Sequence, residues 1–183
     1  MSLALFTDNK TVKNHLRAGN LEVSLIRTNL EYTVLNSSGK LVLHKVEEDL
    51  NFTSSTSANV FGVDSSSLRI VPGSYFKADM QLRNSGNVAF TYDVVIQLTG
   101  QSNALAQQLE VTVTRADGAS VTKKLSETKN GSFVVDTGSM LAGVTSQSFS
   151  VTVKFINDTG INDAAQAQLA EFDLIVRAIQ ATS

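Results

Sequence analysis

The chain has 183 residues, of which 42% are hydrophobic, and this length allows one β-rich domain with a substantial core. Only 17% of the residues are charged and the net charge is −2, which argues against disorder and against nucleic acid or an anionic membrane surface as the main partner. The absence of cysteine excludes disulfides and thiolate metal sites, and no apolar run reaches the roughly 18 residues of a membrane-spanning helix.

The N-terminal part of the sequence predicts short strands separated by turns. Residues 3–8 form an apolar strand candidate at the start of the chain, and apolar and polar side chains alternate over residues 21–25. Two further alternating stretches, residues 30–34 and 41–43, lie on either side of the sequence Asn-Ser-Ser-Gly at 36–39. This arrangement predicts a hairpin with a four-residue loop.

The middle of the chain carries the clearest pattern. Residues 51–67 are rich in Ser, Thr and Asn, so we expect a long loop there with one short strand near Val60 and Phe61. After a Pro-Gly turn, residues 76–82 alternate strictly between apolar and polar side chains, and a second alternation covers residues 88–98. Both stretches therefore predict strands that offer an apolar face to the same core.

The C-terminal half predicts further short strands, with helix-forming residues at two places. Turn sequences such as Asp117-Gly118 separate the strands. Nine or ten short strands in all indicate a two-sheet sandwich or a barrel, in one domain that covers residues 1–183. The expected segments are a helix at 102–108, strands at 109–114, 133–135 and 149–155, a helix at 163–169 and a strand at 172–178.

Three parts of the sequence resemble the TasA/camelysin family of exported matrix proteins of Bacillus-type bacteria. The first is similar to the family's mature N-terminus and the turn into its first strand, the second to its Pro-Gly turn, strand and Asn-x-Gly turn, and the third to its last turn and strand. The matching residues occur in the family's order along the whole chain. They are residues 4–8 and 18–24, residues 68–74 and 82–89, and residues 162–166 and 172–180.

This resemblance implies a jelly-roll sandwich, export, and assembly into extracellular fibres by donation of an N-terminal strand to the next subunit. Residues 1–8 would be the mobile donor strand, and residues 26–67 are a longer insertion than the family pattern leads us to expect. An extended apolar end can complete a neighbour's open sheet edge through main-chain hydrogen bonds. The alternative is that this end packs on its own sheet. The candidate assembly residues are Leu3, Ala4, Leu5 and Phe6.

Camelysins are described as metalloproteases, so a metal site has to be considered. The chain has only two histidines, His15 and His44, and lacks the His-Glu-x-x-His spacing of a zinc protease helix. We therefore interpret His44 and the acidic residues that follow it as a solvated charged bend. Oxygen ligands for calcium are present at Asp158 and Asp163, and Asp8 could face such a site, but the spacing of a regular calcium loop is lacking. We therefore favour capping of the following helix as the role of Asn162 or Asp163.

The sequence predicts an all-β, jelly-roll-like antiparallel β-sandwich with one or two short helices. By the resemblance, it is a secreted structural protein of an extracellular or biofilm matrix fibre. The expected partners are further copies of this chain or related matrix proteins, with no cofactor, no nucleic acid and no membrane span. Two alternatives remain: an exported metalloprotease of the camelysin type, and a cell-surface adhesin or binding module.

Overall fold

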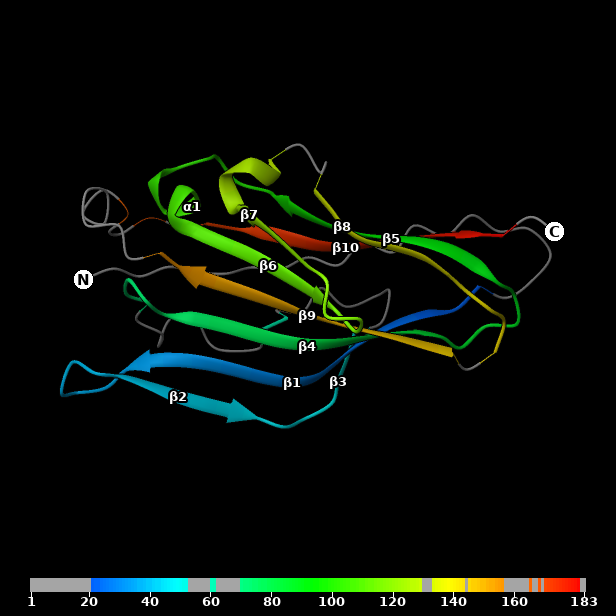
Figure 1. Cartoon of the computed structure of the whole chain (residues 1–183), viewed down its shortest axis with the longest axis horizontal. Coiled ribbons are helices and arrows are strands. Elements are labelled where there is room, and N and C mark those ends of the chain that lie inside the picture. Colours follow the sequence, from blue (N-terminus) through cyan, green and yellow to red (C-terminus); the bar gives the residue numbers. More distant parts are fainter. Residues whose placement is uncertain are drawn as a thin grey trace.

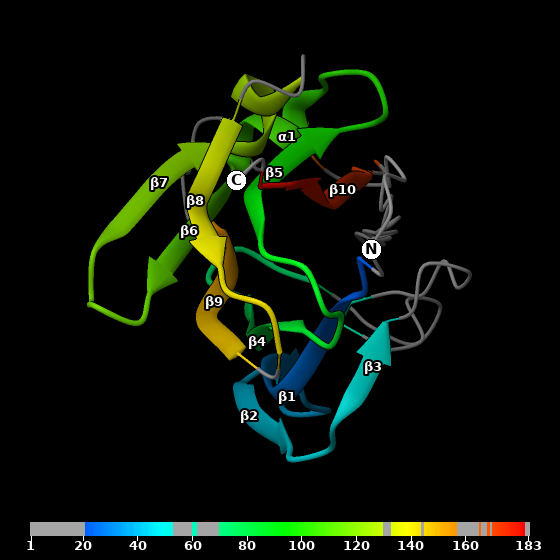
Figure 2. The same cartoon turned by 90° about the vertical axis from the view of Figure 1, so that its right-hand side faces the viewer.

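The computed structural model describes residues 21–52, 60–61, 70–129, 133–143, 145–156, 165, 168 and 170–181. Its strands form two antiparallel sheets that face each other across a hydrophobic core (Figures 1 and 2). The helical segments are α1 (Ala104–Gln108) and the 3-10 turn η1 (Leu125–Thr128). The strands are β1 (Val23–Leu35), β2 (Leu41–Val46), β3 (Leu50–Phe52), β4 (Tyr75–Asn84), β5 (Phe90–Leu98), β6 (Leu109–Arg115), β7 (Ser120–Lys124), β8 (Phe133–Met140), β9 (Thr145–Phe155) and β10 (Phe172–Gln180).

The chain passes from one sheet to the other at most of its connections. The large sheet has the order β2-β1-β4-β9-β6-β7, with β3 also paired to β1, and the small sheet has the order β10-β5-β8. The connections β4–β5, β5–β6, β7–β8, β8–β9 and β9–β10 all cross between the sheets. This confirms the expected all-β, jelly-roll-like antiparallel sandwich with short helices.

The two strands with the clearest sequence pattern belong to different sheets and contribute to the same core. Strand β4 belongs to the large sheet and buries Phe76, Ala78, Met80 and Leu82, while β5 belongs to the small sheet. The side-chain amide of Asn84 fastens the corner between them: it donates to the carbonyl oxygens of Val88 at 2.9 Å and Leu141 at 2.7 Å, and its oxygen accepts from the Gly86 N–H at 3.0 Å. The hydrogen bonds of Asn84 thus link the β4–β5 connection to the β8–β9 connection, and both of these cross between the sheets.

Two predictions in the N-terminal part were wrong in detail. Residues 21–25 and 30–34 do not form separate strands, because β1 runs without interruption over 13 residues. A shift in its pairing with β4 between Arg27 and Asn29 absorbs Thr28 as a bulge, and this changes the phase of the alternation that suggested a break. Val60 and Phe61, expected in a short strand, are turn residues in the structure.

The segment that seemed too long for the family pattern supplies much of the core. It contains most of β1 and all of β2 and β3, and the side chains of Phe52 in β3 and of Val60 and Phe61 in the turn that follows are buried in the core. The Phe61 ring lies 5.6 Å from the ring of Phe76 in β4 and 6.2 Å from that of Phe172 in β10. The turn residue Phe61 therefore packs between a strand of the large sheet and a strand of the small sheet.

The predicted elements of the C-terminal half that fall on described residues are present, and several are longer than expected. Helix α1 begins after Asn103, whose side-chain oxygen accepts from the Ala106 N–H at 2.8 Å and so caps the first turn. Strands β8, β9 and β10 all extend beyond the predicted ranges. Most of the predicted helix at 163–169 lies outside the described residues. No helix in the described part of the chain has the length and hydropathy needed to cross a membrane.

Candidate functional site: two edges of the sandwich

The β1–β2 hairpin has a sharply defined register. The Asn36 N–H donates to Lys40 O at 2.9 Å, and the Gly39 N–H donates to Asn36 O at 3.0 Å. The Asn36 side-chain oxygen accepts from the N–H groups of Ser38 and Lys40 at 3.0 and 2.9 Å. Gly39 has a φ of 72°, which glycine adopts without strain. The predicted hairpin is therefore confirmed, although five residues, 36–40, and not four connect its strands, and this loop fixes the position of β2 against β1.

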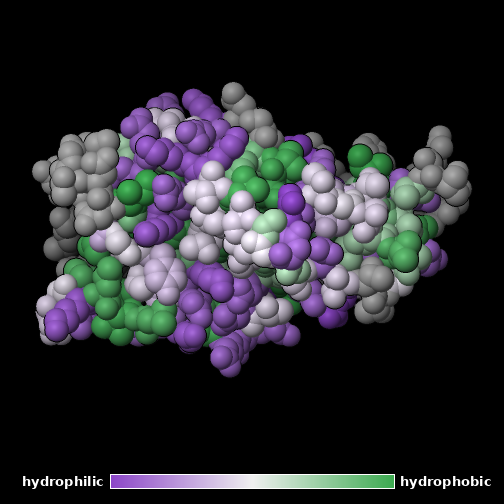
Figure 3. All heavy atoms as spheres, in the orientation of Figure 1, coloured by the Kyte–Doolittle hydropathy of each residue, from purple (hydrophilic) through white to green (hydrophobic). Residues whose placement is uncertain are grey.

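Strand β2 is an edge strand that exposes apolar side chains on both of its faces. Leu41, Val42 and Leu43 are 39%, 38% and 47% exposed, and β2 pairs only with β1 among the described residues. Figure 3 shows a hydrophobic patch at the end of the molecule where the β1–β2 hairpin lies. The ladder between β2 and β1 has no bulge, β2 contains no proline, and no other described strand pairs with it. A regular edge strand of this kind is a template for pairing with another strand.

Cross-strand pairs order the rest of the hairpin. On the outer face, the Lys45 ammonium lies 2.8 Å from the Glu31 carboxylate, and this hydrogen bond and charge raise the pKa of Lys45. On the core face, the rings of Phe76, Tyr32 and His44 form a row across β4, β1 and β2. The centroid of Tyr32 is 5.9 Å from that of Phe76 and 5.4 Å from that of His44, in stacked geometry. The row ties the hairpin to the core.

The hydrogen-bond pattern between β1 and β2 shows which backbone groups of β2 are not bonded to β1. Residues 36 and 40 form a hydrogen-bonded pair, and hydrogen-bonded and non-hydrogen-bonded pairs alternate along an antiparallel ladder. Val42 and His44 therefore direct their N–H and C=O groups to β1. Leu41, Leu43 and Lys45 direct theirs away from the sheet, where they remain available to a further strand.

Strand β8, at the edge of the small sheet, is built differently. Its pairing with β5 shifts between Val94 and Val95, so that Val135 forms a bulge. The guanidinium of Arg115, at the end of β6, donates to Val135 O at 3.4 Å, and its Nε lies 3.0 Å from the carboxylate of Asp136. A bulge and a charged side chain across the edge both oppose the addition of a strand.

Asp136 also connects to the interior of the small sheet. Its side chain is almost fully buried, and the Tyr92 hydroxyl donates to its Oδ2 at 3.1 Å. Burial and, to a lesser extent, the Asp136 charge raise the pKa of Tyr92, while the charge of Arg115 opposes this. A Cβ at Gly138 would lie 2.9 Å from the Tyr92 hydroxyl oxygen, so the side chain of Tyr92 occupies the space that glycine leaves.

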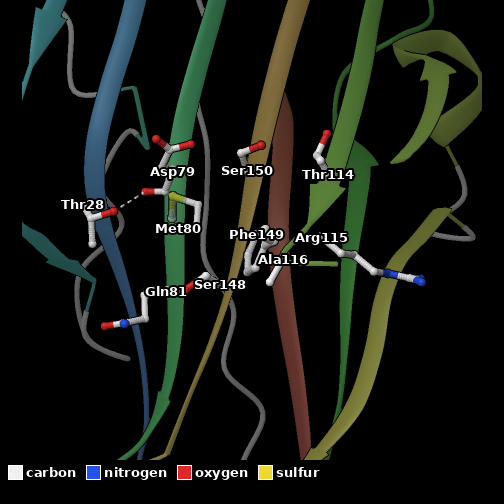
Figure 4. A pocket seen from close by; sticks show the side chains of 10 residues that line it. All are labelled: Thr28, Asp79, Met80, Gln81, Thr114, Arg115, Ala116, Ser148, Phe149 and Ser150. Carbon is white, nitrogen blue, oxygen red and sulfur yellow. Dashed lines mark hydrogen bonds between the residues drawn. The ribbon is translucent and has the colours of Figure 1, made fainter. Parts of the chain in front are cut away.

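A shallow hollow of about 290 Å³ lies on the outer face of the large sheet, over the bulge in β1 (Figure 4). The carboxylate of Asp79 in its wall is already engaged, since it accepts from Asn29 Nδ2 at 3.0 Å and lies 3.3 Å from the Lys77 ammonium. In Figure 4 the Arg115 guanidinium points away from the other lining side chains. The hollow is lined by Thr28, Asp79, Met80, Gln81, Thr114, Arg115, Ala116, Ser148, Phe149 and Ser150.

The candidate site residues from the sequence fall mostly outside the described residues. This holds for Leu3, Ala4, Leu5 and Phe6, for the calcium candidates Asp8, Asp158 and Asp163, and for His15. His44 lies within β2 rather than at its end and stacks on Tyr32. Within the described residues, no three His, Cys, Asp or Glu side chains gather in a way that could hold a metal ion.

Sequence reasoning missed both edge features. The Arg115–Asp136 contact joins residues of different sheets, and no local spacing points to it. The exposure of β2 was also missed, although its sequence carries a usable pattern: three consecutive apolar residues follow a hairpin loop and are followed by His44 and Lys45. Such a run fits a strand buried on both faces as well as an exposed edge strand.

Comparisons with known proteins found no matching family model and no matching curated protein. Among solved structures, the chain is similar to an oxalate decarboxylase, with 11% identity and a TM-score of 0.14 over 75% of this chain and 64% of that one. A variant of the oxalate decarboxylase of Bacillus subtilis gives 10% identity and a TM-score of 0.15 over 82% of this chain and 65% of that one. The chain thus spans under two thirds of these proteins, and the likeness is too low to bear on its fold or activity.

Proposed function

We propose that this protein is a secreted structural subunit of an extracellular or biofilm matrix fibre, and that its copies join by β-strand addition. The N-terminal residues Leu3, Ala4, Leu5 and Phe6 would be the donated strand, as the sequence resemblance to TasA and camelysin implies. Main-chain hydrogen bonds to the acceptor sheet would supply affinity, and the alternate apolar side chains would supply specificity.

One structural observation supports this proposal above the others. Among the described residues, the small sheet has only three strands and ends at β10, and the core also contains Val60 and Phe61, which lie in a turn between β3 and β4. Phe61 in particular lies between Phe76 and Phe172. A strand added beside β10 would extend the small sheet over this aromatic cluster, and its apolar side chains would find an apolar surface beneath them.

The proposal includes no chemical step. The subunit would act as a rigid sandwich that presents one strand and accepts another, so that head-to-tail addition gives an open filament rather than a closed ring. Export would place it where such filaments form.

Deletion of residues 1–8 tests the proposal directly. We expect the truncated protein to keep the far-ultraviolet circular dichroism of the full chain and to form no fibres in electron micrographs after concentration. A matched control replaces Leu3 and Leu5 with Ile, which keeps the apolar pattern and should keep the fibres. Undiminished fibre formation by the truncated protein would contradict the proposal.

A further inference from the structure

We propose that β2 is a self-complementary edge through which two copies of this chain join about a two-fold axis, with β2 of one copy antiparallel to β2 of the other. This contact is independent of the N-terminal residues. It would join the large sheets of two subunits into one continuous sheet, and it would link fibres side by side, whereas strand donation would extend them.

The backbone supports this pairing. Leu41, Leu43 and Lys45 direct their N–H and C=O groups away from β1, as deduced above from the hairpin register. If the two-fold axis is perpendicular to the joined sheet, the outer face of one subunit continues into the outer face of the other. Residues that lie opposite each other across the contact must then point to the same face of the sheet. With Leu43 opposite its own copy, Leu41 opposes Lys45, and all the outward-directed groups of both strands find partners.

The side chains support a second copy as the occupant. In this register, Leu43 meets Leu43 on the outer face and Val42 meets His44 on the core face, so the centre of the contact has no charge opposite a like charge. Each of the three exposed apolar side chains of β2 would gain a neighbouring side chain of the second copy and lose part of its exposure to water. The charge of Lys45 is held by Glu31 of its own chain, 2.8 Å away.

Charge complementarity selects the antiparallel direction. Lys40 precedes β2, and the acidic residues Glu47, Glu48 and Asp49 follow it. Antiparallel pairing brings Lys40 of each copy beside the acidic bend of the other, and the two-fold axis makes this contact twice. Parallel pairing would instead set lysine beside lysine and acid beside acid. The small net charge of −2 adds little repulsion between copies.

A contact of one short strand per copy belongs to the class of small interfaces, which bury less than about 1,200 Å² and are weak. It would be populated mainly at high protein concentration or between neighbouring fibres, where several contacts act together. Chemical trapping is therefore the appropriate test, and the natural absence of cysteine makes single-cysteine variants unambiguous.

The test compares disulfide formation by full-length single-cysteine variants at high concentration. In the proposed register, the Cα atoms of the two Leu43 residues lie about 5.5 Å apart, within the range that a disulfide spans. Leu43→Cys should therefore form covalent dimers at least tenfold faster than Leu141→Cys, a control at an apolar side chain that is 74% exposed and lies outside β2. Equal rates for these two variants would overturn the proposal.

The register has its own test. Two Leu41 residues would lie about 14 Å apart, so Leu41→Cys alone should cross-link poorly, whereas a mixture of Leu41→Cys with Lys45→Cys should cross-link readily. Faster dimerisation of Leu41→Cys than of Leu43→Cys would overturn the register proposed here. The deletion of residues 1–8 should leave Leu43→Cys cross-linking unchanged, so a failure of strand donation and a failure of this contact give different results.

Discussion

The edges formed by β2 and β8 differ in how they deal with unpaired backbone groups. At β8, a bulge at Val135 interrupts the ladder, and Arg115 reaches across the edge to Val135 O and to the carboxylate of Asp136. At β2, the strand is regular, and Leu41, Val42 and Leu43 are exposed. The first arrangement discourages the addition of a strand and the second favours it. Of these two edges, β2 is therefore the one suited to pairing with a further strand.

Arg115→Met should have the largest effect, because it removes the ion pair of a buried carboxylate while it keeps most of the aliphatic stem. We expect a loss of about 3 kcal/mol in the free energy of unfolding, at the lower end for buried pairs because the Arg115 side chain is partly exposed. Urea denaturation would measure this. Arg177→Met, at an exposed arginine of β10, is the matched control and should change stability by less than about 0.5 kcal/mol. Equal effects of the two substitutions would mean that the contacts of Arg115 with β8 do not contribute to stability.

Gly138→Ala tests the same edge through packing. The new Cβ would lie 2.9 Å from the Tyr92 hydroxyl oxygen, so the ring or the strand must move. We expect a loss of about 2 kcal/mol, as for other overpacked sites. Gly100→Ala is the control, since a Cβ there meets nothing within 4 Å. A stability of Gly138→Ala as high as that of the control, measured by thermal denaturation, would mean that the Tyr92–Asp136 contact is looser than described.

Tyr92→Phe should cost about 1 kcal/mol at neutral pH, the usual value of one hydrogen bond, and should also change the pH dependence of stability. Burial, followed by the Asp136 charge, raises the pKa of Tyr92. Above pH ~10 the unfolded chain therefore releases this proton while the folded protein keeps it. The contribution is present below that pH and is lost as the pH rises further. Chemical denaturation between pH 8 and 11 should show a weaker alkaline loss for the variant than for the unaltered protein.

Leu43→Lys should have the smallest effect on stability and a clear effect on association. The side chain is 47% exposed, so we expect a change of less than about 0.5 kcal/mol. Sedimentation velocity should show less dimer than for the unaltered chain at the same concentration. Leu141→Lys, the matched control, should leave the dimer fraction unchanged. If Leu141→Lys lowered the dimer fraction and Leu43→Lys did not, the contact between copies would lie at Leu141 and not at β2.

The sequence predicts the scaffold well wherever local rules decide. The alternation in β4 and β5 and the loop at 36–39 were predicted because strand period and turn chemistry act over a few residues. The continuity of β1 was missed, since Thr28 changes the phase of the alternation within one strand. Val60 and Phe61 were placed in a strand because two buried apolar residues fit a strand and a buried turn equally well.

The edges could not be predicted from the sequence. Asp136 and Arg115 meet only because the chain crosses between the sheets, and the exposure of Leu43 depends on which strands lie beside β2. Both are properties of topology, which local periodicity does not contain. The family resemblance pointed to assembly at a sheet edge and named the N-terminal residues, but it gave no indication of β2.

The most direct test of the account is amide hydrogen exchange of the unaltered protein at low and high concentration. If β2 pairs with a second copy, the N–H groups of Leu41, Leu43 and Lys45 exchange more slowly as concentration rises, while those along the outer edge of β8 do not change. Rates at these three residues that are independent of concentration, or slowing confined to β8, would contradict it.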